Sequence, residues 1–142
     1  MVAARAEDAV KIPGLNKAPA AAAEALKKYA ADNGMKIGKV SIEKQGKVTV
    51  YEATLSAEGK PEHEVSVTAD GKIKGEEETV AIDSVPEAPR KAIQENAKGA
   101  KITRVQKIKE DGVTTYEAEY SAKGKTTEVE FTEDGKVKPE EK

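Results

Sequence analysis

The stretch TTYEAEYSAKGKTTEVEF, residues 114–131, decides the fold because apolar and polar side chains alternate on both sides of a Lys-Gly pair. Successive side chains of a strand point to opposite faces, so this alternation predicts two strands, each with one buried and one solvent-facing side. The Lys123-Gly124 pair predicts a short turn that makes the two strands antiparallel. The residues expected on the buried side are Tyr116, Ala118, Tyr120, Val129 and Phe131.

The same pattern occurs earlier in the chain, which indicates an internal repeat. Tyr51-Glu52-Ala53 precedes Tyr116-Glu117-Ala118 by 65 residues, and segment 34–40 precedes the similar segment 99–105 by the same number. Each copy also has a helical pattern before its strands, at about 19–32 in the first copy. We therefore predict an α+β protein of two tandem repeats, each one helix packed on a three- to four-stranded antiparallel sheet.

The repeat sets the expected domain boundaries. We expect residues 8–77 to form the first repeat and residues 78–142 the second, with the acidic run Glu76-Glu77-Glu78 as a solvated linker. Residues 1–7 are expected to be a disordered or signal-remnant segment, because Ala4-Arg5-Ala6 is typical of the end of a signal peptide. A frayed N-terminus is the alternative. A signal remnant would place the mature protein in the periplasm or outside the cell.

Composition excludes several classes of function. The 142 residues have no Cys, no Trp, one His and a formal net charge of -2, which excludes disulfides, thiolate metal sites and Cys nucleophiles. A nucleic-acid-binding protein would carry a basic patch, which is not seen here. No apolar run approaches the roughly 20 residues of a membrane span. We expect no enzyme activity and no cofactor; the single His63 is expected to be structural or incidental.

The solvent-facing side of the strands is the candidate functional surface. A polar sheet face can recognise a partner, although ordinary solvation produces the same pattern. As partner-binding residues we expect Val50, Glu52, Thr54, Glu117, Glu119, Glu128 and Glu130. Binding of a hard cation such as calcium by Glu52 with Glu64, and by the four glutamates 117, 119, 128 and 130, is the alternative, because such ions prefer several oxygen ligands.

Several motifs resemble the PepSY-like domains, and in particular their beta-lactamase-inhibitor-like subgroup. The resemblance covers both copies and is carried by segments 85–93 and 99–102, by Thr115-Tyr116-Glu117-Ala118, and by Glu128–Phe131 with Asp134-Gly135-Lys136. It implies a fold like that of the beta-lactamase inhibitory proteins and an exported, non-enzymatic module. It also implies a protein partner, such as a secreted peptidase or other hydrolase that is restrained by binding. The chain has no Cys to staple the repeats, in contrast to that inhibitor.

Overall fold

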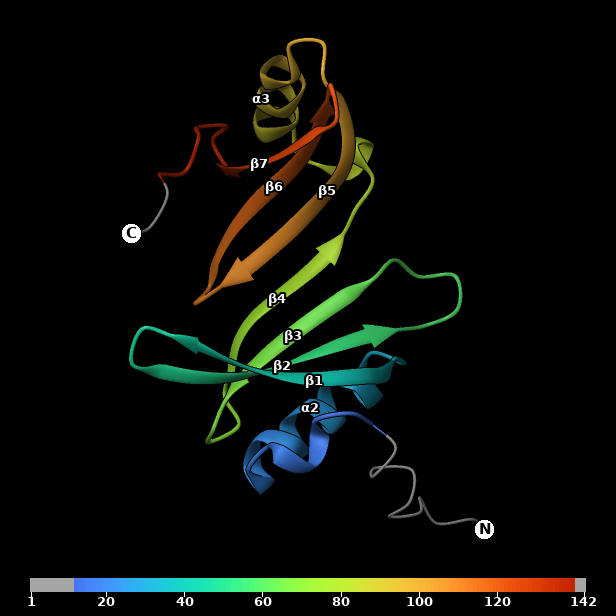
Figure 1. Ribbon diagram of the computed structural model, residues 1–142, viewed down its shortest axis with the longest axis vertical. Helices are drawn as coiled ribbons and strands as arrows, with labels where there is room; N and C mark the ends of the chain where they lie inside the picture. Colours follow the sequence, from blue (N-terminus) through green and yellow to red (C-terminus); the bar gives the residue numbers. More distant parts are fainter. Residues whose placement is uncertain (1–11, 140–142) are drawn as a thin grey trace. The chain divides into compact units, whose positions relative to one another are not determined.

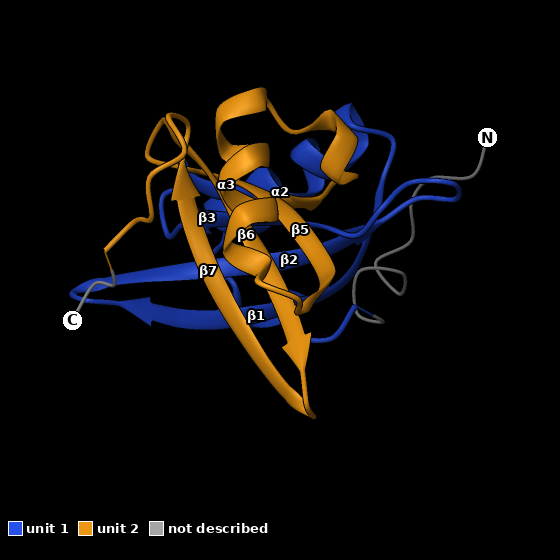
Figure 2. Cartoon of the chain, turned by 90° about the horizontal axis from the view of Figure 1, so that it is seen from above, with its two compact units in different colours: residues 1–76 blue, residues 77–142 orange. Residues whose placement is uncertain are grey.

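The alternating segments form seven strands, and two α-helices cover them in the computed structural model (Figure 1). The structure describes residues 12–139, so the expected segment 1–7 lies outside the described residues. The chain divides into two units at Glu76/Glu77, coloured separately in Figure 2, and each unit is described by itself. The helices and sheet make the fold class α+β, as predicted.

Unit 1 packs one helix on an antiparallel sheet. A 3-10 helix at Leu15–Lys17 and α2 (Ala20–Asp32) precede β1 (Lys36–Gln45), β2 (Val48–Ser56) and β3 (His63–Thr68). β2 pairs antiparallel with both β1 and β3. β4 (Ile73–Thr79) follows and contains the boundary between the units.

Helix α2 forms where the sequence predicted it. Pro19 occupies the N-cap, where it needs no backbone N–H, and Gly34 follows the helix with a φ of 65°. Leu26 is completely buried at the centre of the inward face. The residues that form the core with it are Leu15, Ala22, Ala30, Val40, Ala53, Leu55, Val65 and Val67.

Unit 2 repeats this arrangement. After a 3-10 helix at Ile82–Ser84, α3 (Glu87–Ala97) covers β5 (Lys101–Glu110), β6 (Val113–Ala122) and β7 (Lys125–Thr132). β6 pairs antiparallel with β5 and β7. The tyrosines face the helix as predicted, because the core contains Ile93 together with Val85, Val105, Tyr116, Ala118, Tyr120 and Phe131.

The connection between β6 and β7 is a two-residue turn. Lys123 and Gly124 have φ values of 51° and 76°, the left-handed geometry that suits the twist of a tight hairpin. This turn pairs Ala122 with Lys125. The β2–β3 connection of unit 1, residues 57–62, is longer.

A second turn closes each sheet against its helix. Gly71 N–H donates to the Thr68 carbonyl over 2.9 Å, and Gly135 N–H donates to the Thr132 carbonyl over 3.0 Å. Each glycine has a positive φ and approaches the first turn of a helix so closely that a Cβ would lie 2.8 Å from the Ala21 carbonyl oxygen or 2.7 Å from that of Ala88. Only glycine fits such a position without displacing backbone.

One detail differs from the sequence-based expectations. The acidic run 76–78 was expected to be solvated, but it lies within β4, where its side chains are half-buried. Two local features complete unit 2. Pro86 is the N-cap of α3, and the Ser84 hydroxyl donates to the Ala81 carbonyl. The pairing of β5 with β6 has an irregularity between Ile102 and Arg104.

Within residues 12–139, no helix has the length and apolar character needed to cross a membrane.

Candidate functional site

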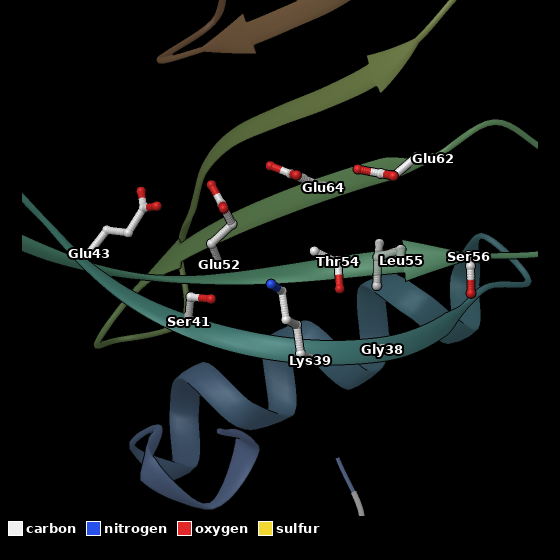
Figure 3. A pocket seen from close by; sticks show the side chains of 10 residues that line it. All are labelled: Gly38, Lys39, Ser41, Glu43, Glu52, Thr54, Leu55, Ser56, Glu62 and Glu64. Atoms are coloured by element: carbon white, nitrogen blue, oxygen red, sulfur yellow. The ribbon is translucent and has the colours of Figure 1, made fainter. Parts of the chain in front are cut away.

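We define the outer face of each unit as the side of the sheet that points away from the helix. In unit 1, β2 places Val50, Glu52 and Thr54 on this face, and β3 places Glu64 and Ser66 there. An open hollow of about 540 Å³ lies over this part of the sheet. Figure 3 shows that Glu52 and Glu64 rise from neighbouring strands on the same side of the sheet, with Glu43 and Lys39 from β1.

Glu52 and Glu64 are diagonal neighbours across β2 and β3. The register pairs Glu52 with Ser66 and Thr54 with Glu64, so Glu64 lies two residues along β3 from the residue opposite Glu52. Long side chains reach each other at this spacing. Burial, followed by the charges of Glu64 and Glu43 and a side-chain hydrogen bond with Glu64, raises the pKa of Glu52 to about 7, although Lys39 opposes the rise.

Unit 2 has an equivalent arrangement. The register pairs Glu117 with Glu130 and Glu119 with Glu128, which makes Glu117 and Glu128 diagonal neighbours. These two residues line a hollow of about 530 Å³. Burial, followed by a hydrogen bond with Glu128 and the charges of Glu128, Glu77 and Glu130, raises the pKa of Glu117 to about 7.

The other two predicted glutamates of unit 2 have different partners. Arg104 contacts the Glu119 carboxylate at 3.3 Å, and the Thr103 hydroxyl donates to Glu119 over 2.8 Å. The Glu130 carboxylate forms an ion pair with Lys138 Nζ at 3.2 Å and accepts a hydrogen bond from the Thr115 hydroxyl over 2.5 Å. Cations and hydroxyls therefore compensate Glu119 and Glu130, whereas Glu117 and Glu128 are diagonal neighbours that line the same hollow.

One predicted partner-binding residue is not exposed. Val50 was expected at the surface, but its exposure is 0%, and Ser66 and Thr115 on the outer faces are also buried. Alternation assigns a side chain to one face of the sheet, but it does not fix the exposure, which depends on what lies around that side chain. A fully buried valine cannot contact a partner directly, so Val50 leaves the set of candidate contact residues.

The remaining predicted residues lie on the outer faces as expected. Glu52 and Thr54 belong to the face of unit 1, and Glu117, Glu119, Glu128 and Glu130 belong to the face of unit 2. Glu128 is exposed and the other five are half-buried. Sequence analysis missed Glu43 and Lys39 as members of the unit 1 site, because they enter it from β1.

The helix side of unit 1 has a separate polar cluster around His63. The Tyr29 hydroxyl lies 2.8 Å from His63 Nε2 and donates a hydrogen bond to a Glu76 carboxylate oxygen. These residues come from α2, β3 and β4, and all three are half-buried. The cluster ties the helix to the sheet, which agrees with a structural role for His63. Sequence spacing could not have predicted it, because its members are 34 and 47 residues apart.

The glutamates do not assemble into a set of metal ligands in the described part of the chain. Across residues 12–139, no group of three or more His, Cys, Asp and Glu side chains is arranged to hold a metal ion. The predicted cation alternative therefore gains no support from this geometry.

Comparisons with known proteins give structural relatives only. No family model and no curated protein matches the chain. A solved BLIP-like protein from Bacteroides fragilis is 22% identical with a TM-score of 0.62, and the match covers 95% of this chain and 90% of that one. A candidate periplasmic protein from Bacteroides eggerthii is 19% identical with a TM-score of 0.66, covering 84% and 85%. A DUF2874 family protein from Bacteroides uniformis is 18% identical with a TM-score of 0.65, covering 84% and 86%.

These likenesses define a class of fold. The chain has an α+β fold similar to that of the BLIP-like and DUF2874 proteins, as the sequence predicted. The three proteins are less than 25% identical to this chain, so the similarity concerns the fold alone. The resemblance to PepSY-like domains and the tandem-repeat interpretation stay predictions.

Proposed function

We propose that this chain is an exported, non-catalytic binding module that acts in the periplasm and binds a protein partner through its outer faces. The partner class that the resemblance implies is a secreted peptidase or other hydrolase, whose activity the module inhibits or regulates. The fold similarity to a BLIP-like protein and to a candidate periplasmic protein supports this proposal. We also propose that the chain is a PepSY-like tandem repeat.

The observation that carries the proposal is the pair of equivalent acidic hollows. Each outer face has a hollow, of about 540 Å³ in unit 1 and about 530 Å³ in unit 2, whose carboxyl groups come from adjacent strands. A rigid sheet holds such side chains more precisely than a loop does, which favours recognition of a complementary surface. The proposed contacts are Glu52, Thr54, Glu117, Glu119, Glu128 and Glu130.

Charge reversal on the outer face tests this proposal. The double variant Glu117→Lys, Glu119→Lys should lose the partner that the natural chain captures from the secreted or periplasmic fraction of its source organism. Glu87→Lys is the matched control, because Glu87 is an exposed residue on α3 whose ion pair with Lys91 lies on the surface of the helix. We expect the control to keep the partner. Retention of the partner by the outer-face double variant would show that the outer face is not the binding surface.

A further inference from the structure

We propose that the free edge of β1 is a binding site for an extended, acidic segment of a partner protein, which adds to the sheet of unit 1 as a further strand. We define the free edge as the backbone N–H and C=O groups of Ile42 and Lys44. It is separate from the outer faces, so this site goes beyond the proposed function. A strand added to a sheet edge is held mainly by main-chain hydrogen bonds.

The backbone groups of the free edge point away from β2. Residues of an antiparallel strand direct their backbone groups alternately toward one neighbouring strand and toward the opposite side. Val40 N–H points to the opposite side, because it donates to the Pro13 carbonyl over 2.7 Å. The pairing of β1 with β2 is regular beyond Val40, so Ile42 and Lys44 point in the same direction as Val40.

The chain covers this side of β1 at Val40, and within residues 12–139 the cover ends there. Pro13 accepts the Val40 N–H, and a Cβ on Gly14 would lie 1.9 Å from the Val40 carbonyl oxygen. In the same part of the chain, β2 is the one strand that pairs with β1. Ile42 is 48% exposed and Lys44 is also exposed, so the free edge is open to solvent.

Unit 2 shows what binds to an equivalent edge. Val105 holds in β5 the place that Val40 holds in β1, since each is buried and lies opposite an alanine, Ala118 or Ala53, of the next strand. The Val105 carbonyl accepts a 2.9 Å hydrogen bond from Val80 N–H. The side of β5 away from β6 therefore already has a neighbouring segment, whereas the corresponding side of β1 is open at Ile42.

The charges of the strands indicate an acidic occupant. The part of β4 that belongs to unit 2 adjoins β5 and begins with Glu77 and Glu78. β5, with the sequence KITRVQKIKE, has four cations and one anion, so the strand beside it is opposite in charge. β1 is also basic, with three lysines and one glutamate in KIGKVSIEKQ. Because opposite charges on neighbouring strands stabilise their pairing, an acidic segment fits β1 as well.

The same lysines argue against a second copy of the chain as the occupant. Pairing of two β1 strands through Ile42 and Lys44 would bring the lysines of both copies to one seam. Like charges on paired strands are destabilising, and lysine on an edge strand is a common means of preventing such association. An acidic segment removes this repulsion.

Amide hydrogen exchange of the full chain, followed by NMR, tests the site with a synthetic peptide. The probe is the sequence of β4, IKGEEET, with both ends blocked, because the end of this strand adjoins β5. In the chain alone, the amides of Ile42 and Lys44 should exchange rapidly, and those of Ser41 and Glu43, which face β2, more slowly. Millimolar peptide should slow exchange at Ile42 and Lys44 by about three-fold or more and leave the other two unchanged.

Altered peptides separate strand pairing from charge. Two versions of the probe carry N-methyl groups on alternate amides, one at odd and one at even positions. A strand bound by one edge uses the donors of one set only, so one version should lose binding and the other should keep it. The same outcome for both versions would overturn strand addition. The peptide IKGKKKT should bind several-fold more weakly than the probe, and equal binding would overturn the acidic character of the occupant.

Charge reversal on the chain gives a second test of the acidic occupant. The double variant Lys39→Glu, Lys44→Glu should weaken binding of the probe several-fold. Lys17→Glu with Lys27→Glu is the matched control, because it changes the net charge equally at exposed residues outside β1. Thermal melting checks that both variants fold. Equal binding by the two double variants would overturn the role of the β1 lysines.

Two results of the exchange experiment would overturn the site itself. In one, millimolar probe leaves exchange at Ile42 and Lys44 unchanged. In the other, both amides exchange slowly in the chain alone, which would mean that the edge already has an occupant. Sedimentation would then identify that occupant, as a second copy if the chain is dimeric and as another part of the same chain if it is monomeric. Neither result decides the proposed function, whose test depends on Glu117 and Glu119.

Discussion

The hydroxyl of Tyr120 donates a 2.7 Å hydrogen bond to the backbone carbonyl oxygen of Ile93, which joins β6 to α3 inside the core of unit 2. Both residues are buried, so water does not compete for this bond. The equivalent position in unit 1, 65 residues earlier, is Leu55, whose apolar side chain packs in the core. The two units therefore join helix to sheet by different interactions at the same place.

Removal of this hydroxyl should destabilise the chain. Tyr120→Phe keeps the ring but loses the bond, at an expected cost of about 1 kcal/mol in the free energy of unfolding. Urea denaturation followed by circular dichroism measures the change. Tyr51→Phe is the control, because Tyr51 is half-buried at the edge of the unit 1 core, and we expect it to change stability less. An equal effect of both variants would contradict a specific role for the Tyr120 bond.

Gly135 should tolerate alanine poorly. A Cβ there would lie 2.7 Å from the carbonyl oxygen of Ala88, and the φ of 84° is itself unfavourable for alanine. Gly124 is a control for the effect of φ alone, since its φ is 76° but no atom lies within 4 Å of the position of a Cβ. We expect Gly124→Ala to cost about 1 kcal/mol and Gly135→Ala to cost clearly more, measured as free energies of unfolding. Equal costs would mean that the helix moves away without penalty.

Stability should fall as the pH rises toward neutrality. The pKa values of Glu52 and Glu117 are raised from 4.5 to about 7 in the folded chain, so the folded state binds more protons than the unfolded state in this interval. Their contribution is present below about pH 4.5 and is lost as the pH rises through about 7. Thermal melting at pH 5.5 and pH 8 should give the lower midpoint at pH 8, and Glu64→Gln with Glu128→Gln should reduce the difference.

The opposite dependence should appear in acid. Hydrogen bonds from Thr68 and Thr132 lower the pKa values of Asp70 and Asp134 below their ordinary value of 3.8. These carboxylates stabilise the fold above that value and lose their contribution as the pH falls through their lowered pKa values. Thr68→Val and Thr132→Val should therefore weaken the decline of stability below about pH 4. If the decline of stability below about pH 4 were unchanged in these variants, the two turns would not be the cause of that decline.

The bridge formed by Tyr29 should matter more than a nearby surface ion pair. Tyr29→Phe removes the hydroxyl that contacts both His63 and Glu76 and should cost about 1 kcal/mol or more. Lys28→Ala removes a 2.9 Å ion pair with Asp32 on the exposed side of the same helix and should cost less than about 0.5 kcal/mol. Urea denaturation of both variants measures the two losses of unfolding free energy. A larger loss in Lys28→Ala than in Tyr29→Phe would contradict a stabilising role of the Tyr29 bridge.

Alternation was sufficient to predict the helix-facing residues of both sheets. Tyr116 and Tyr120 lie in the core and Glu52 and Glu117 on the outer faces, because side-chain direction follows directly from the period of a strand. Exposure did not follow in the same way, as Val50 shows. The acidic run 76–78 was misassigned because charge density resembles a linker, although a strand with half-buried sides can also carry it.

The diagonal carboxyl pairs required information that alternation lacks. They depend on strand register, which the two-residue turn at Lys123-Gly124 could in principle have indicated for unit 2. The longer connection 57–62 leaves several registers open in unit 1. The contact of Tyr29 with Glu76 depends on the packing of α2 against a strand formed much later in the chain, so no local pattern contains it.

The length of the Lys123-Gly124 turn sets the register in which β6 pairs with β7. One residue inserted into either strand next to it would exchange the two sides of that strand, because side chains alternate at every step. The aromatic rings of one strand would then enter water, and carboxylates would be driven beneath α3. The length of this connection therefore decides which side chains of the hairpin meet the helix and which face outward.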